Sequence, residues 1–316
     1  MANLFIIGNG FDLSHYLKTS YDDFKKFLLL SYPNIIMDEL IIPEGIELSD
    51  GGIDYDENDV LSMLFYLIDE EEGNISDIEI KWRDIENSLG HLNFSQIYDY
   101  HEDIFDKDGD IDYWKTAARN ENLIENLIVP ATAIQGYFSE WVNSIEINCA
   151  DPKKDFKSLL KENDQFLVFN YTDTLEVVYD VCDSNICYIH GRQGEEIHFG
   201  HGNLEDNTEI YMQQNIGSEN GLNDIYYQLR KKTEIALEDN SEFFSNLEEC
   251  NISRIYSYGF SFSEVDKIYL EEICTMLKTE KVIWYFNDYD SHQVENYKKI
   301  LVECGFKGIF NTFYIT

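Results

Sequence analysis

The sequence is poor in basic residues and in long apolar runs. It holds 23 Lys and Arg against 61 Asp and Glu, so its formal net charge is -38 at pH 7. Nucleic acids are bound largely through cations on phosphates, and this balance argues against a general DNA or RNA binder. The same charge disfavours docking on anionic membranes. No apolar stretch approaches the ~20 residues that span a bilayer, and the Leu4–Ile7 run is too short for a signal-peptide core.

The cysteines lack any recognisable pattern. None forms a C-x-x-C pair, and no Cys/His group has zinc spacing, so we predict no metal site. Most of them lie in or beside apolar segments, as buried free thiols do in a reducing compartment. We therefore expect a cytoplasmic protein. We also expect no tightly bound cofactor. The six positions are Cys149, Cys182, Cys187, Cys250, Cys274 and Cys304.

What the sequence does contain is typical of a folded globular protein. Hydrophobic residues make up 44% of the chain and aromatic residues 15%, which excludes a disordered polypeptide. With 316 residues it can form one large α/β domain or two domains with a sizeable core.

One stretch, Phe166–Gly191, predicts a strand, a helix and a second strand. Short apolar runs rich in aromatic and β-branched residues occur at 166–169 and 186–189. Between them, 172–179 reads as a capped start followed by apolar residues at helical spacing. This order predicts a parallel βαβ unit, in which ligands bind beyond the carboxyl ends of the strands.

Two polar residues follow directly on those strands. Asn170 ends the first and His190, followed by Gly191, ends the second. A neutral hydrogen-bonding group beside a titratable base suits the placing and activation of a hydroxyl or a water. The alternative is that Asn170 caps the next helix and His190 merely ends a strand. We predict the first, with Thr172 and Asp173 as further ligand contacts.

The N-terminus predicts a second loop at the same edge. The strand Leu4–Ile7 runs into Gly8-Asn9-Gly10-Phe11-Asp12, and a glycine turn after a strand lets a ligand approach the backbone amides. The third glycine of the usual dinucleotide motif is missing, since position 13 is leucine, so a plain tight turn remains the alternative.

Further strand patterns predict the rest of the sheet. They lie at 255–258, 282–286 and 310–315, each after or before a helical pattern. Residues 35–161 carry helical spacing and no strand signal of similar strength. We therefore predict an α/β fold with a doubly wound, mainly parallel, Rossmann-like sheet. Its nucleotide-binding core is 1–34 plus 162–316, and 35–161 is a mainly helical insertion.

Two other groups of residues invite a functional interpretation. Asp84 and Glu86 lie in the segment 82–86, where a solvated helix face is a better prediction than carboxylates pointing into a crevice. His201 stands between two glycines, and we expect it to line a ligand.

Five blocks taken together resemble the AbiH family of bacteriophage abortive-infection proteins. They span nearly the whole chain, and the first and third are the more specific. The blocks are IIGNGFDLSHYLKTSYDDF (6–24), WRDIE (82–86), FNYTDTLEVVY (169–179), IHG with FGHGN (189–203) and YSYGFSFSEVDKIYL (256–270).

AbiH proteins in turn look like distant relatives of sirtuin-like NAD-consuming effectors. That resemblance implies cleavage of the bond between nicotinamide and ribose, with NAD as the substrate. It implies that Gly8 and Gly10 hold the phosphates, that Asn170 orients the ribose or a water, and that His190 is the general base. Gly259 and Ser261 would line the adenosine side. Asn9, Phe11, Asp12 and the other residues named above complete the expected binding site.

The sequence also departs from the sirtuin pattern. Asp12 stands where such proteins have a small hydroxyl residue, and the zinc-binding cysteine quartet is absent, so deacetylation is not expected. Two other functions remain open: a non-enzymatic sensor that binds a nucleotide, and a metal-dependent nuclease using Asp12, Asp84 and Glu86. Expected partners are NAD or a related nucleotide, a phage-derived trigger protein and further copies of the chain, but neither nucleic acid nor a membrane.

Overall fold

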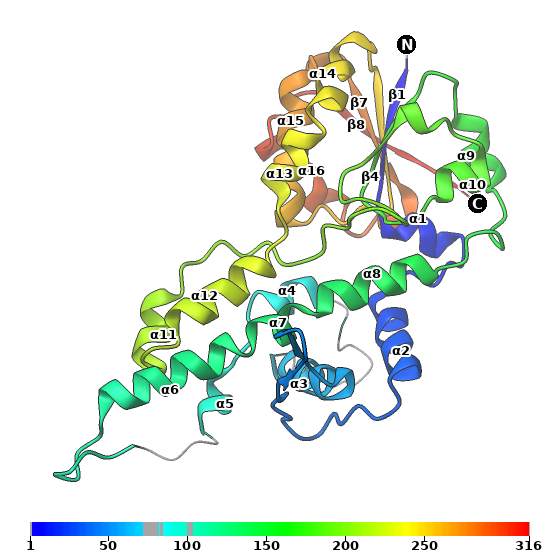
Figure 1. Ribbon diagram of the computed structural model, residues 1–316. Helices are drawn as coiled ribbons and strands as arrows, with labels where there is room; N and C mark the ends of the chain where they lie inside the picture. The colour runs from blue at the N-terminus through cyan, green and yellow to red at the C-terminus, as the bar shows by residue number, and fades with distance from the viewer. Residues whose placement is uncertain (1, 72–81, 83–84, 100–103, 316) are drawn as a thin grey trace. The chain divides into compact units, whose positions relative to one another are not determined.

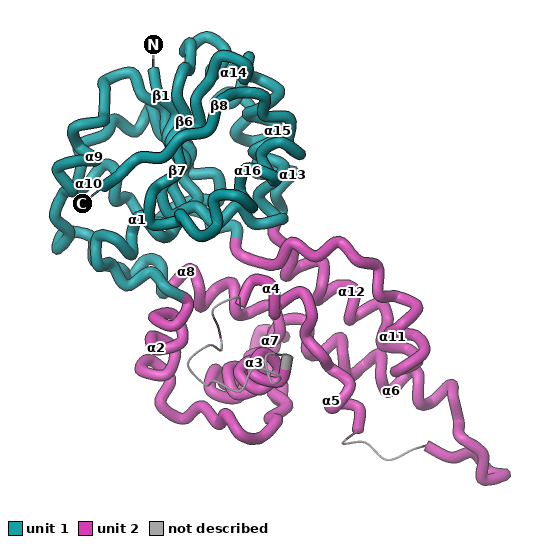
Figure 2. Tube along the Cα trace, turned by 180° about the vertical axis from the view of Figure 1, so that it is seen from behind, with its two compact units in different colours: residues 1–20, 141–198, 232–316 teal, residues 21–140, 199–231 magenta. Residues whose placement is uncertain are grey.

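The described chain divides into two compact units. The computed structural model describes residues 2–71, 82, 85–99 and 104–315. Unit 1 is built from residues 1–20, 141–198 and 232–316, and unit 2 from residues 21–140 and 199–231 (Figure 2). Each unit is therefore assembled from segments that are far apart in the sequence.

Unit 1 contains a parallel sheet of six described strands. Their order is β5-β4-β1-β6-β7-β8, so the chain moves outward from β1 to β5, returns beside β1 as β6 and continues the other way. All neighbouring pairs are parallel. The strands are β1 (Asn3–Ile7), β4 (Gln165–Val168), β5 (Ile186–Tyr188), β6 (Arg254–Tyr258), β7 (Ile283–Asn287) and β8 (Ile309–Phe313).

The strands form because both of their faces are buried. All five residues of β1 are buried, and alternate side chains point to opposite faces of a sheet. On one face Phe5 stacks on Phe166 at 5.1 Å and on Tyr256 at 5.0 Å, and Tyr256 stacks on Tyr285 at 4.7 Å between ring centroids. This aromatic row ties four neighbouring strands together.

Helices cover both faces of the sheet (Figure 1). On the face of the aromatic row lie α1 (Asn9–Ser14), α9 (Lys154–Leu159) and α10 (Thr174–Tyr179). On the other face lie α13 (Thr233–Asp239), α14 (Ser241–Glu249), α15 (Lys267–Met276) and α16 (Val294–Glu303). Short 3₁₀ turns connect the elements: η1 (Asp183–Asn185), η2 (Glu264–Asp266), η3 (Thr279–Lys281) and η4 (Asp288–Asp290).

Unit 2 is mainly helical, with one small hairpin of β2 (Ile46–Glu47) and β3 (Ile53–Asp54). Its core includes the ring of Trp82, which lies 4.6 Å from that of Phe65 and 5.9 Å from that of Phe24. Its helices are α2 (Tyr21–Ser31), α3 (Glu57–Glu71), α4 (Ile85–Leu89), α5 (Ser95–Asp99), α6 (Tyr113–Glu125), α7 (Ile128–Thr132), α11 (Thr208–Gln214) and α12 (Glu219–Gln228). Helix α8 (Ile134–Ser144) runs from unit 2 into unit 1.

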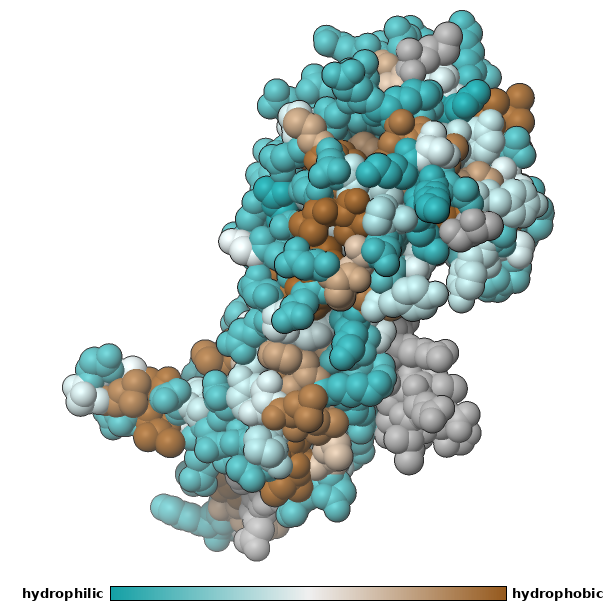
Figure 3. All heavy atoms as spheres, turned by 90° about the vertical axis from the view of Figure 1, so that its right-hand side faces the viewer, coloured by the Kyte–Doolittle hydropathy of each residue, from teal (hydrophilic) through white to brown (hydrophobic). Residues whose placement is uncertain are grey.

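The surface reflects the composition. Hydrophilic side chains cover most of the face in Figure 3, and hydrophobic ones gather there in separate groups. No helix in the described ranges has both the length and the apolar character needed to cross a membrane.

The prediction of an α/β fold around a mainly parallel sheet is confirmed, and every described pair in that sheet is parallel. The unit boundaries fall elsewhere than the predicted domain boundaries: residues 141–161 belong to unit 1, and 21–34 and 199–231 to unit 2. The ring of Phe156 packs edge-on to Phe5 at 5.5 Å, which draws α9 onto the sheet. A helical pattern alone does not show which surface a helix packs against.

Candidate functional site

The turn after β1 packs tightly against the turn after β6. Gly8 N donates to Tyr258 O and Gly10 N to Gly259 O, both at 3.0 Å. A Cβ on Gly8 would lie 2.5 Å from Gly259 O, and one on Gly10 would lie 2.6 Å from Gly259 Cα. Gly259 itself has φ +65°, a conformation that favours glycine. The close approach of two backbones thus requires glycine at three positions that the sequence marked for a ligand.

Asn9 and Phe11, the residues on either side of Gly10, have different surroundings. Asn9 is exposed, and its Nδ2 donates to Thr19 O at 2.8 Å. Phe11 is fully buried, with its ring 5.1 Å from that of Phe156 and 5.2 Å from that of Tyr258. Phe11 therefore anchors α1 in the core.

Asp12 is a buried carboxylate held by two hydroxyls. It is 1% exposed, Thr174 Oγ1 donates to its Oδ1 at 2.8 Å, and Thr172 Oγ1 donates to its Oδ2. Burial raises the pKa of Asp12 to about 6, and the hydrogen bonds from Thr172 and Thr174 oppose that rise. Asp12 therefore changes charge close to physiological pH, as groups in functional sites often do.

Asn170 lies beside this carboxylate, where its amide lowers the pKa of Asp12. Its side chain is 4% exposed, yet neither Nδ2 nor Oδ1 is in hydrogen-bonding geometry with any group in the described part of the chain. Nor does it cap the next helix, because the N-cap of α10 is Asp173. An amide buried in this way without a well-formed hydrogen bond costs about 1–3 kcal/mol, and a ligand or a water bound to it would recover that cost.

Asp173 adjoins the same group. It is half-buried, burial raises the pKa of its carboxyl group, and Arg192 opposes that rise. Its buried Oδ1 has no hydrogen-bond partner among the residues that the structure describes.

His190 follows β5 and lies inside an aromatic enclosure. It is 1% exposed, and its ring centroid is 5.4 Å from that of Phe169, 5.6 Å from Tyr269 and 6.4 Å from Tyr171. Its Nε2 lies 3.8 Å from Asp266 Oδ1. An imidazole facing a carboxylate within apolar rings is a common arrangement for a general base.

Gly191 and Ser261, which were also predicted to contact the ligand, lie in a turn and in an exposed loop. Gly191 has φ +79°, and a Cβ there would lie 1.9 Å from Glu196 O, so this glycine serves the turn that carries His190. Ser261 is exposed in the loop after β6.

His201 lies in unit 2, whereas the residues above belong to unit 1. Its Nε2 donates to Tyr226 O at 2.9 Å, and its Nδ1 accepts from Asn203 N at 3.2 Å. Both ring nitrogens are engaged by backbone groups, so His201 holds its loop against helix α12.

Unit 1 thus brings together two groups of predicted residues at the carboxyl ends of β1, β4 and β5. Asp12, Asn170 and Thr172 form one, and His190 belongs to the other. Sequence reasoning missed Thr174, which completes the cradle of Asp12, and Asp266 and Tyr269, which face His190. The repeat Thr172-x-Thr174 was visible, but nothing in the sequence paired Asp266 with a residue 76 positions away.

The two described residues of the proposed metal-dependent nuclease lie in different units. Glu86 Oε1 lies 3.1 Å from the ammonium group of Lys231 in unit 2, Asp12 lies in unit 1, and Asp84 falls outside the described residues. Over the described ranges, no three His, Cys, Asp or Glu side chains lie together as a metal site requires.

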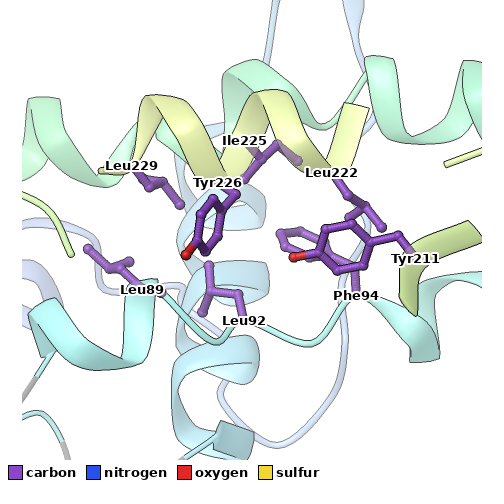
Figure 4. A pocket seen from close by; sticks show the side chains of 9 residues that line it. Leu89, Leu92, Phe94, Tyr211, Leu222, Ile225, Tyr226 and Leu229 are labelled. Carbon is purple, nitrogen blue, oxygen red and sulfur yellow. The ribbon is translucent and has the colours of Figure 1, made fainter. Parts of the chain in front are cut away.

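Unit 2 contains a small pocket (Figure 4). Leucine and aromatic side chains point toward one another across it, and none of the residues predicted for ligand binding lines it. The lining residues are Leu89, Gly90, Leu92, Phe94, Tyr211, Leu222, Ile225, Tyr226 and Leu229.

Comparison with known proteins identifies the family. Residues 4–288 match the family described as "Bacteriophage abortive infection AbiH", which covers most of the chain. No curated protein and no solved structure matches it. The chain therefore belongs to the AbiH family, and this membership implies a role in abortive infection, a defence against bacteriophage.

Proposed function

We propose that this AbiH protein hydrolyses the nicotinamide–ribose bond of NAD, and that loss of NAD stops the host cell before a phage completes its replication. The observation that carries the proposal is the buried amide of Asn170, which has no partner in the described chain and lies beside Asp12. In our proposal Asn170 orients the ribose or the attacking water, and His190 is the general base.

The strand order supports a nucleotide as the ligand. Renumbered along the chain, the sheet reads 3-2-1-4-5-6, the order of doubly wound dinucleotide-binding folds. Ligands of such sheets bind outside the carboxyl ends of the strands, where the direction of winding reverses. Here that point lies beside β1, next to the turns that carry Gly8 and Gly259. We propose on this ground a Rossmann-like, sirtuin-like site.

The proposed reaction has a simple balance. The electron pair of the bond between ribose C1′ and the nicotinamide nitrogen goes to the nicotinamide, which leaves neutral. Water oxygen bonds to C1′, and a proton of that water passes to His190. Because the sugar becomes cation-like as the bond breaks, an ionised Asp12 nearby would stabilise it.

In the proposed site, Gly8 and Gly10 act by packing the turn after β1 against the end of β6. Since the amides of Gly8 and Gly10 donate to the loop after β6, they bring the ends of β1 and β6 together. A phage-derived trigger protein and self-association remain part of the proposal, because an enzyme that depletes NAD has to stay silent before infection.

The decisive experiment is a timed assay that separates nicotinamide from intact NAD. We compare the purified protein with Asn170→Ala and with Asn296→Ala, which alters an exposed asparagine of the same unit. Release by the wild type and by Asn296→Ala, but not by Asn170→Ala, supports the proposal. If Asn170→Ala releases nicotinamide at the wild-type rate, the proposed site is wrong.

A second assay separates an enzyme from a sensor. If infected cells keep their NAD, yet Asn170→Ala abolishes protection against phage, the site binds a ligand without cleaving NAD. Depletion of NAD in infected cells that carry the wild type, and not in those that carry Asn170→Ala, supports the enzyme.

A further inference from the structure

The carboxylate of Asp266 approaches one particular nitrogen of His190. Asp266 Oδ1 lies 3.8 Å from His190 Nε2. The two residues come from different parts of the chain, His190 from the segment after β5 and Asp266 from the end of η2. Both are buried, at 1% and 7% exposure.

Asp266 is itself held in place. Ser263 Oγ donates to its Oδ2 at 2.7 Å, so the other oxygen, Oδ1, is the one that faces the imidazole. A carboxylate that a neighbouring hydroxyl holds by a hydrogen bond orients its partner more firmly than a mobile one does.

The surroundings strengthen this interaction. The rings of Phe169, Tyr171 and Tyr269 pack around His190, so the charge on Asp266 acts through a medium with little water. Among the residues that the structure describes, the phenols of Tyr171 and Tyr269 also lie against the imidazole, and Asp266 is a carboxylate that faces it.

We propose that Asp266 is the positioning residue of His190: it keeps the imidazole proton on Nε2 and thereby presents Nδ1 as the base. In the reaction, Nδ1 takes the proton of the attacking water, and Asp266 stabilises the imidazolium that forms. The role of Asp266 in hydrolysis rests on the proposed function, but its pairing with His190 does not. The pairing and the role in hydrolysis are therefore tested separately.

The first test is NMR of the histidine side chains between pH 5 and 9. His190→Gln identifies the His190 signals. In the wild type the nitrogen shifts should show the proton on Nε2 at neutral pH. In Asp266→Asn the pKa of His190 should fall by about 1 pH unit, because an opposite charge within ~4–6 Å favours the protonated imidazole. Glu264→Gln removes an exposed carboxylate of the same turn and should change neither quantity.

Two results would overturn the pairing. One is a wild-type spectrum with the proton on Nδ1, which does not depend on whether Asp266→Asn folds. The other is an unchanged pKa of His190 in a folded Asp266→Asn protein. Neither depends on whether NAD is cleaved.

The second test applies if the wild type cleaves NAD. Asp266→Asn should lower kcat by about 10-fold or more with little change in KM, and the acidic limb of its pH profile should move with the NMR pKa. Asp266→Glu should recover part of the rate. If the NMR pairing holds and the wild type releases no nicotinamide, the proposed function fails while the pairing stands.

Discussion

Two buried histidines show how differently the two units use the same residue. His190 and His201 each lie next to a glycine, and they are 1% and 0% exposed. His201 engages both ring nitrogens with backbone groups, Asn203 N in its own loop and Tyr226 O in helix α12. His190 instead faces a carboxylate inside a ring of aromatic side chains. A histidine bound to backbone fixes a loop, whereas one that faces a carboxylate is arranged for proton transfer.

The comparison extends to their neighbours. Around the first histidine, the carboxyl edge of the sheet gathers Asp12, Asn170 and Asp266 in buried positions. Around the second, the carbonyl of Tyr226 accepts from His201, and leucine and aromatic side chains line the pocket beside Tyr226. Unit 1 therefore gathers buried polar groups at one edge of its sheet, where their burial costs stability.

We expect the largest effect when the two histidines are replaced in turn and nicotinamide release is measured. His190→Ala should lower nicotinamide release about 10²–10⁴-fold, the range for loss of a general base, whereas His201→Ala should keep the rate of whatever fraction is folded. His292→Ala changes an exposed histidine of unit 1 and serves as the control. Equal rates for His190→Ala and His292→Ala would remove His190 from the mechanism.

The second effect concerns the packed loops at the edge of the sheet. Gly259→Ala should lower the free energy of unfolding by about 3 kcal/mol, because the residue has φ +65° and its Cβ would lie 2.3 Å from Phe11 N. Gly194 also has a positive φ but no atom within 4 Å of its Cβ, so Gly194→Ala should cost only about 1–2 kcal/mol. Urea denaturation measures both, and equal losses would contradict the close packing.

The third prediction is that the free energy of unfolding depends on pH through Asp12, at the carboxyl edge of the sheet. Burial raises the pKa of Asp12 from 3.8 to about 6, so the folded state holds its proton at pH values where the unfolded chain has lost it. The stabilising contribution is therefore complete below about pH 4 and is lost as the pH rises through about 6, by at most about 3 kcal/mol.

Asp12→Asn should remove that dependence. Unfolding in urea between pH 4 and 8 should show the wild type losing stability relative to Asp12→Asn as the pH rises. Asp151→Asn, which alters an exposed carboxylate of unit 1, should follow the wild type. Parallel curves for the wild type and Asp12→Asn would show that Asp12 is ionised at no cost.

The smallest predicted effect concerns His201, whose contribution to stability falls as the pH falls, opposite to that of Asp12. Burial lowers the pKa of His201, so its contribution to stability is present above about pH 6.5 and is lost as the pH falls. His201→Ala should cost about 2 kcal/mol at pH 8, because two backbone groups lose their partner, and less at pH 5. Thermal unfolding at the two pH values measures this, and a cost that grows toward pH 5 would contradict it.

Much of the fold followed from local patterns. The apolar runs Leu4–Ile7 and Phe166–Phe169 predicted β1 and β4, since runs of this length and composition are stable only when both faces are covered. Asn170 and His190 stood at strand ends, and parallel strands present their carboxyl ends at one edge. The edge that carries the candidate site was therefore predictable.

Local sequence patterns were enough to predict the parallel α/β sheet, the family and the edge at which Asn170 and His190 lie. The tertiary structure was needed to show that Gly8, Gly10 and Gly259 pack two loops together, that Thr174 holds Asp12 and that Asp266 faces His190. It also placed His201 in the other unit. The physical reason is that strand and helix signals are local, whereas the partner of a buried polar atom depends on which distant segments fold against it.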